Sequence, residues 1–153
     1  MTSDKEFIPA AIAATGKGSF ASSKSAEAAN SLFIGMLRDI ALGCVNAGST
    51  MIGHIKANIR SGGELLAMSS TTDDGNVRSR YTFAKEVKDY TMTVNVIVYG
   101  IERYKAAEIL VSNVKKALSN VDIEVHSEVG CEDPECNDPL CQRDEHKRII
   151  TIG

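Results

Sequence analysis

Residues 90–99 read YTMTVNVIVY, and this stretch decides the fold class because its side chains alternate in character. A period of two is typical of a β-strand with one buried face. The apolar set is Met92, Val94, Val96 and Val98, and the opposite set is Thr91, Thr93, Asn95 and Tyr99. The segment therefore predicts a strand that packs one face on a core and turns the other to water.

Further stretches alternate in the same way and predict more strands. Residues 51–60 (MIGHIKANIR) set Ile55, Ala57 and Ile59 against His54, Lys56, Asn58 and Arg60. Residues 77–84 (VRSRYTFA) set Val77, Tyr81 and Phe83 against Arg78, Arg80 and Thr82. Residues 121–128 (VDIEVHSE) set Val121, Ile123 and Val125 against Asp122, Glu124 and His126. Glycine turns bound a strand at 64–71 (ELLAMSST), and residues 147–152 (KRIITI) predict the last strand.

Two stretches repeat apolar side chains at three- and four-residue spacing, which predicts helices. The first starts near Ser25, a residue suited to an N-cap. Its stripe is Leu32, Met36, Leu37, Ile40, Ala41 and Cys44. The second helix is expected at 102–119, with the stripe Ala106, Leu110, Val114 and Leu118. Residues 1–25 are rich in Ser, Ala, Gly and Lys without periodicity, so we expect a flexible N-terminal arm there.

These elements predict an α+β fold in which an antiparallel β-sheet carries two helices packed on one face. The expected order is α-β-β-β-β-α-β-β. We expect one domain over residues 26–153, following the arm at 1–25. If the last two strands pair, they form a C-terminal hairpin whose long Cys-rich loop, residues 128–147, would bind a metal.

Length and composition favour an ordinary globular domain. The chain has 153 residues, 43% hydrophobic and 24% charged, which is enough for a single core. No unbroken apolar run approaches the roughly 18–20 residues that span a bilayer. No basic leader precedes an apolar segment, so we expect a cytoplasmic protein with no membrane partner. In a reducing compartment, cysteines close in sequence indicate metal or redox chemistry before disulfides.

The most informative chemical motif is a ladder of possible metal ligands at a strict five-residue interval. Its members are His126, Cys131, Cys136, Cys141 and His146. Zinc is commonly held by four thiolates and imidazoles from short loops, and gaps of four residues suit such loops. Asp-Pro pairs at 133–134 and 138–139 favour turns between the thiols. The ladder therefore predicts a zinc site.

Cys131, Cys136 and Cys141 are the expected thiolate ligands, and His146 and His126 compete for the fourth place. An iron–sulfur cluster is the alternative cofactor, although the spacing matches neither common ferredoxin pattern. Cys44 lies on a helical apolar stripe, so we expect a buried structural thiol. A closed shell of three cysteines and one histidine is typical of structural zinc, so we expect no enzyme, with a zinc-dependent enzyme as a remaining alternative.

Charge patterning leaves two kinds of partner open. The net charge of −3 is local to the Cys-rich segment, and the chain lacks the strongly basic composition of many nucleic-acid binders. We expect a small metal-binding accessory or interaction protein whose partner is another protein or a second copy. The alternative is an anion-, nucleotide- or RNA-binding module on the polar sheet face, with candidate residues His54, Lys56, Asn58, Arg60, Arg78, Arg80, Asn95, Tyr99 and His126.

Overall fold

The computed structural model describes residues 8–127 and 150–152. The elements along the chain are β1 (Ala10–Lys24), α1 (Ala26–Asn46), β2 (Met51–Ser61), β3 (Glu64–Ser70), β4 (Arg78–Tyr81), β5 (Val87–Tyr99), α2 (Arg103–Ala117), β6 (Val121–Ser127) and β7 (Ile150–Ile152). Over the described ranges, the strands form one seven-stranded sheet in the order β4-β3-β2-β5-β1-β6-β7. Every neighbouring pair is antiparallel. The predicted α+β class is confirmed.

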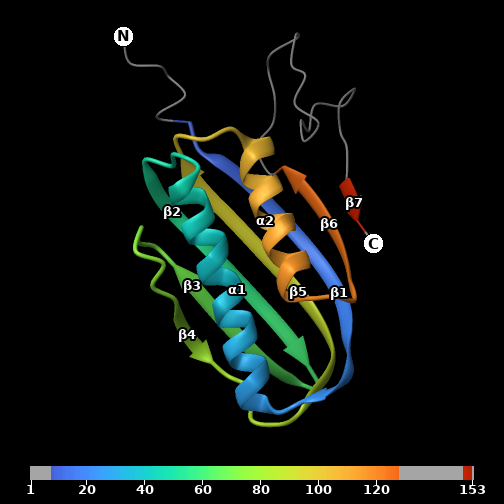
Figure 1. Ribbon diagram of the computed structural model, residues 1–153. Helices are drawn as coiled ribbons and strands as arrows, with labels where there is room; N and C mark the ends of the chain where they lie inside the picture. Colours follow the sequence, from blue (N-terminus) through green and yellow to red (C-terminus); the bar gives the residue numbers. More distant parts are fainter. Residues whose placement is uncertain (1–7, 128–149, 153) are drawn as a thin grey trace, which may run out of the picture.

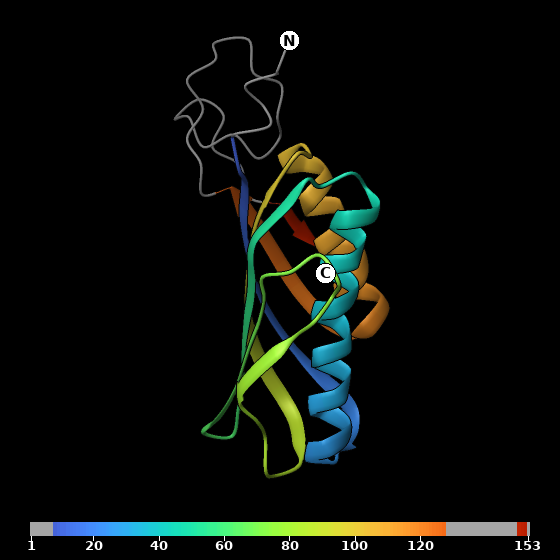
Figure 2. The ribbon, with the colours of Figure 1, turned by 90° about the vertical axis from the view of Figure 1, so that its left-hand side faces the viewer.

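The two helices lie side by side and cover the same face of the sheet (Figures 1 and 2). α1 packs over β2, β3 and β5, whereas α2 packs over β1 and β6. The core lies between the helices and this sheet face. The alternating apolar residues of β2, β5 and β6 are buried there as predicted, including Ile55, Val96 and Ile123, each 0% exposed. Within residues 8–127 and 150–152, no helix lies on the opposite sheet face, which we call the helix-free face (Figure 2).

The expectation of a flexible arm at residues 1–25 is wrong for β1. Ala10–Lys24 is a 15-residue strand between β5 and β6, with partners on both sides. Its Ala, Gly and Ser residues have low intrinsic strand preference, and pairing on two edges supplies the order instead. Small residues also suit the position, since a Cβ at Gly18 would lie 2.5 Å from both the Asn120 carbonyl oxygen and Tyr90 Oη. Residues 1–7 lie outside the described ranges.

A second correction concerns Tyr81, which the alternation of 77–84 places in the buried set. It is 55% exposed. β4 pairs with β3 through an irregularity, with Tyr81 opposite Ala67 but Ser79 opposite Met68. An extra residue in one strand reverses the face of every side chain beyond it. Tyr81 therefore shares the helix-free face with Ala67.

Helix α1 begins where its N-cap predicts. Ser25 has extended backbone, and its hydroxyl accepts a hydrogen bond from the Ala28 amide at 3.2 Å. By length and composition alone, α1 could cross a membrane, with a mean hydropathy of 1.3. The core helix of a soluble protein passes the same test, and α1 has a buried stripe against the sheet: Ala29, Phe33, Met36, Leu37, Ile40, Ala41 and Cys44. The apolar face of α1 thus has its partner within the fold.

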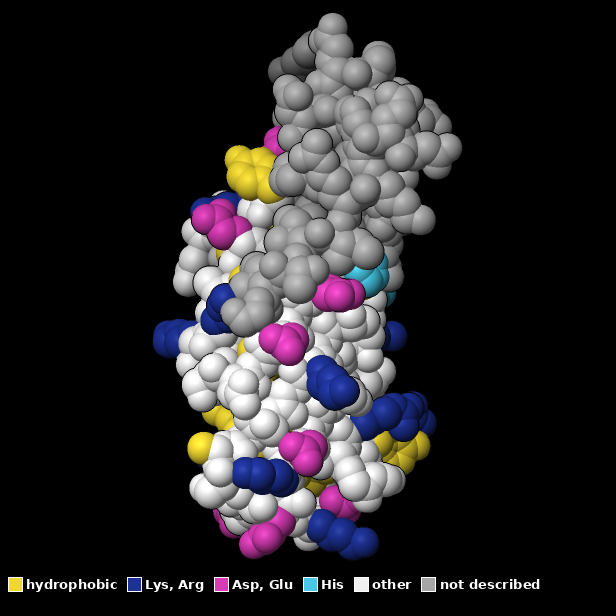
Figure 3. All heavy atoms as spheres, turned by 90° about the vertical axis from the view of Figure 1, so that its right-hand side faces the viewer, with side chains coloured by type: hydrophobic (Ala, Val, Ile, Leu, Met, Phe, Trp, Pro, Cys, Tyr) yellow, Lys and Arg dark blue, Asp and Glu magenta, His cyan; other side chains and the backbone are white. Residues whose placement is uncertain are grey.

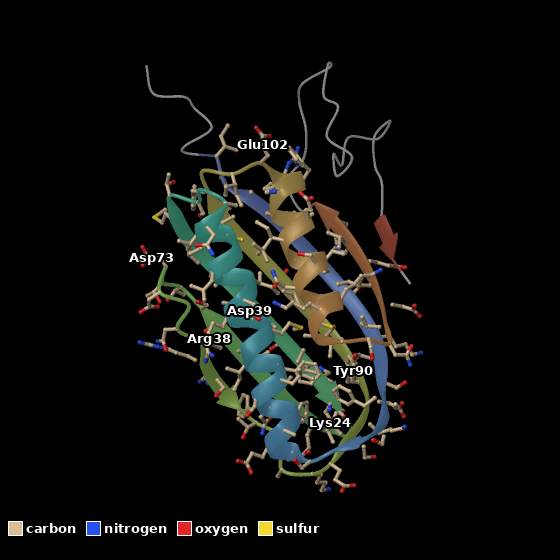
Figure 4. All side chains as sticks on the ribbon, viewed as in Figure 1. Lys24, Arg38, Asp39, Asp73, Tyr90 and Glu102 are labelled. Atoms are coloured by element: carbon tan, nitrogen blue, oxygen red, sulfur yellow. The ribbon has the colours of Figure 1, made fainter. Side chains whose placement is uncertain are left out.

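Aromatic side chains pack together beneath the start of α1. The Tyr90 ring centroid lies 5.2 Å from that of Phe20 and 5.3 Å from that of Phe33. Lys24 Nζ lies 5.2 Å from the centroid of Phe20. Figure 4 shows Tyr90 and Lys24 at this end of the sheet. Burial raises the pKa of Tyr90 to about 12. The cluster joins β1, β5 and α1 into one core.

Candidate functional surface

The helix-free sheet face is built from cross-strand rows, each containing one residue from β2, β5, β1 and β6. Residues directly opposite in neighbouring strands turn their side chains to the same face. The first row is Arg60, Thr91, Lys17 and Asp122. The second row is Asn58, Thr93, Thr15 and Glu124. The third row is Lys56, Asn95, Ala13 and His126.

Along the four central strands of this face, charged side chains are concentrated on β2 and β6, with Lys17 on β1 between them. The cations Lys56 and Arg60 lie on β2, and both are exposed. The acids Asp122 and Glu124 lie on β6, and both are also exposed. β5 and β1 lie between them and carry mostly threonine, asparagine and alanine. The face is therefore basic along one strand and acidic along another, three strand positions away.

A shallow open groove of about 690 Å³ crosses the face at the first row. Its lining includes Lys17, Arg60, Thr91, Asp122 and Asp89. Glu64 also lines it, so acidic side chains stand beside the two cations. Charges of both signs are likewise mixed among the coloured residues on the side of the molecule that carries β6 (Figure 3). A groove of this composition is suited to a partner that carries both charges.

Hydrogen bonds to backbone groups fix the walls of this groove. The Ser61 hydroxyl donates to the Asp89 carbonyl oxygen at 2.6 Å. The Glu64 carboxylate accepts hydrogen bonds from the Ala84 and Lys85 amides at 3.0 and 3.1 Å. Glu64 therefore holds the loop before β5 in place. Lys17 and Arg60 are the cationic side chains among the described residues that line the groove.

Several residues predicted for the polar face are found on it. His54, Lys56, Asn58 and Arg60 alternate with buried partners along β2 after an irregularity at Gly53. Arg78 lies on β4, which is an edge strand of the sheet, opposite Ser69. The pairing of β3 with β4 passes from Ser79 to Tyr81, so Arg80 has no opposite residue in β3. Arg78 and Arg80 are thus separated from the cations of the groove.

Lys17 and Asp122 complete the first row. The alternation of polar and apolar residues in the sequence does not mark either of them as a functional residue. Lys17 belongs to the segment that the sequence predicts as an arm, so its place beside Thr91 depends on the pairing of β1 with β5. Asp122 is recognisable as an outward residue of its strand. The register of β6 against β1 decides that it lies next to Lys17.

Of the ladder residues, His126 lies within the described part of the chain. It is half-buried, opposite Ala13 at the end of β6. The predicted outward orientation of His126 is confirmed. Cys131, Cys136, Cys141 and His146, together with the whole predicted metal loop at 128–147, lie outside the described residues. The pairing of β6 with β7 sets Val125 opposite Ile150 on either side of that segment.

Cys44 is a buried core thiol, as predicted. It is 0% exposed on the sheet side of α1, and burial raises its pKa to about 11. A protonated thiol in this position is a poor metal ligand and a poor nucleophile. Across residues 8–127 and 150–152, no group of three or more His, Cys, Asp or Glu side chains could hold a metal ion.

Comparison of the chain with protein-family models, with curated proteins and with solved structures gives no significant match.

Proposed function

We propose that this protein is a small zinc-binding interaction protein whose metal orders the acidic Cys-rich segment as a surface for a partner. The observation that carries the proposal is the regular spacing of His126, Cys131, Cys136, Cys141 and His146. Three thiols and two imidazoles at this spacing provide more than the four ligands that structural zinc requires. The segment between the thiols contains little apolar material, so metal coordination would supply the free energy that a core does not.

The antiparallel pairing of β6 with β7 supports this proposal. Val125 and Ile150 are opposite one another, so both ends of the segment start from neighbouring strands. Bringing the ends of a loop together in advance lowers the entropy that ligand closure must overcome. His126 is the last residue of β6 whose side chain faces away from the helices, and it lies on the helix-free face.

Metal content and folding state test the proposal together. Purified protein should contain one zinc per chain, and Cys136→Ser should lose it. Cys44→Ala is the matched control, because it removes a thiol from the core and should leave zinc content unchanged. A parent protein without zinc or iron would refute a metal-binding role. Iron with visible sulfide-to-iron absorption would instead identify the iron–sulfur alternative.

The fourth ligand can be assigned by comparing His126→Gln with His146→Gln. The variant that lacks the ligand should bind zinc at least tenfold more weakly, since a closed shell of four becomes a shell of three. Equal losses in both variants would contradict a single fourth ligand. If zinc loss leaves partner binding unchanged, the metal does not order the interaction surface. A water-derived ligand on zinc, together with hydrolytic turnover, would favour the enzyme alternative.

A second candidate function, anion or nucleic-acid binding, is supported by Lys17 and Arg60 in the open groove. The Thr91 hydroxyl, between the two cations, could donate a hydrogen bond to a phosphate oxygen. Lys17→Ala combined with Arg60→Ala should then abolish binding of inorganic phosphate or a short RNA. Arg78→Glu is the matched comparison at the far end of the sheet. Binding that is insensitive to salt and to both changes would exclude this candidate.

A further inference from the structure

We infer that the helix-free face is a self-complementary interface that pairs two copies of this chain, β2 of each copy lying over β6 of the other. The inference uses described residues alone and is independent of the zinc proposal. Its basis is the division of charge between β2 and β6 together with the register of the four central strands.

Symmetry selects the contacts. We place a two-fold axis parallel to the strands, midway between the two stacked sheets and between β5 and β1. This axis brings β2 of one copy over β6 of the other, and each cross-strand row lies over the same row of the other copy. Arg60 of one copy then faces Asp122 of the other, and the reciprocal pair forms as well. Such an isologous interface closes after two copies.

The middle of the interface is compatible with close stacking. In the second row, Thr15 faces Thr93 of the other copy, and Asn58 faces Glu124. Beyond the third row, half-buried Ile97 lies opposite Ala11, which is 6% exposed. In the second and third rows the residues beside the axis are uncharged, namely Thr15, Thr93, Ala13 and Asn95, whereas Lys17 and Thr91 flank the axis in the first row. The uncharged rows allow two backbones to approach.

Distances agree with this arrangement. Stacked sheets lie about 10 Å apart, a gap that an arginine and an aspartate can span together. Aligned sheets cross at about 30°, which shifts β2 relative to the opposed β6 by roughly 4 Å along the strands. That shift is shorter than an arginine side chain. Within one copy, Arg60 and Asp122 are three strand spacings apart, about 14 Å, and are too far apart to pair with each other.

The interface is small. Four strands and the rows described cover roughly 20 Å by 25 Å, or about 500 Å² per copy, near the lower end for specific interfaces. We therefore expect a dimer that dissociates in the micromolar range. In the third row Lys56 faces His126, a pair that adds no attraction, so the Arg60–Asp122 pairs set the orientation of the two copies.

Charge reversal tests the inference by sedimentation velocity over a micromolar concentration series of the full chain. Each of Arg60→Asp and Asp122→Arg places two like-charge pairs in the homodimer and should raise the dissociation constant by roughly tenfold to a hundredfold. An equimolar mixture of these two variants should regain the dimer, because both cross pairs are then opposite in charge. Arg38→Asp and Asp39→Arg, on exposed positions of α1 (Figure 4), are matched controls that should keep the parent's behaviour.

Several results would overturn the inference. They are a parent that stays monomeric throughout the series, a dimer equally sensitive to the α1 controls, and a mixture that remains monomeric. A dimer that a chelator abolishes would assign self-association to the metal segment. If both reversals keep the parent's mass while Arg60→Asp loses binding of inorganic phosphate, the face is an anion site and is not the interface between two copies.

Discussion

The side chain of Asn30 ties α1 to the loop between β4 and β5, and its removal is the sharpest test of how this fold is held. Asn30 Nδ2 donates to the Phe83 carbonyl oxygen at 3.1 Å, and Asn30 Oδ1 accepts from the Phe83 amide at 2.9 Å. The Asn30 side chain thus pairs with both backbone groups of Phe83, as a neighbouring β-strand would. They hold Phe83, which is 4% exposed, in contact with the aromatic cluster.

Asn30→Ala removes both bonds and leaves the Phe83 backbone groups partly buried without this partner. Each bond contributes about 1 kcal/mol net, so the free energy of unfolding should fall by about 2 kcal/mol. For a chain of this length the melting temperature should fall by roughly 4–8 °C. Urea unfolding followed by circular dichroism measures the first quantity and a thermal scan the second. Hydrogen exchange at the Phe83 amide should accelerate by a larger factor than exchange in β5.

Ser31→Ala is the matched control, because Ser31 is the exposed neighbour of Asn30 on the same helix. Its unfolding free energy should stay within about 0.5 kcal/mol of the parent value. The reasoning is refuted if Asn30→Ala is as stable as Ser31→Ala, or if the Phe83 amide keeps its protection in the Asn30 variant.

The remaining predictions concern close packing, a buried hydroxyl and a buried thiol. Gly18→Ala should destabilise by about 1–3 kcal/mol because its Cβ would collide with Tyr90, whereas Gly35→Ala, in open space within α1, should stabilise by roughly 0.5–1 kcal/mol in urea unfolding. Ser70 Oγ is buried and, within the described part of the chain, lacks a hydrogen-bond partner, so Ser70→Ala should raise the melting temperature; a lower one would contradict this. In a variant whose other cysteines are serine, Cys44 should react with a thiol reagent at pH 8 no faster than global unfolding. Burial raises the pKa of Cys44 from 9.0 to about 11, so the free energy of unfolding should fall as pH rises through that interval. A free energy of unfolding that is independent of pH there would count against this burial.

Part of the candidate surface could be derived from sequence alone. Alternation within residues 51–60 assigns Lys56 and Arg60 to the polar face, and alternation within β6 assigns Asp122 and Glu124 to the same class. A period of two is a local property of an extended backbone, so it needs no knowledge of neighbouring strands. Which strands are neighbours is a different matter, because their order depends on contacts between residues far apart in the chain.

The sequence by itself determined the buried faces of β2, β5, β6 and the two helices, since burial follows the periodicity of the backbone. It also determined the ligand ladder from His126 to His146, which remains a prediction of chemistry. Tertiary structure decided that residues 10–24 form a central strand, because pairing on two edges outweighs the weak strand preference of Ala, Gly and Ser. It likewise decided that Tyr81 turns outward, and that Arg60 and Asp122 stand in one row. Register between distant strands produces that row, and local patterns carry no information about it.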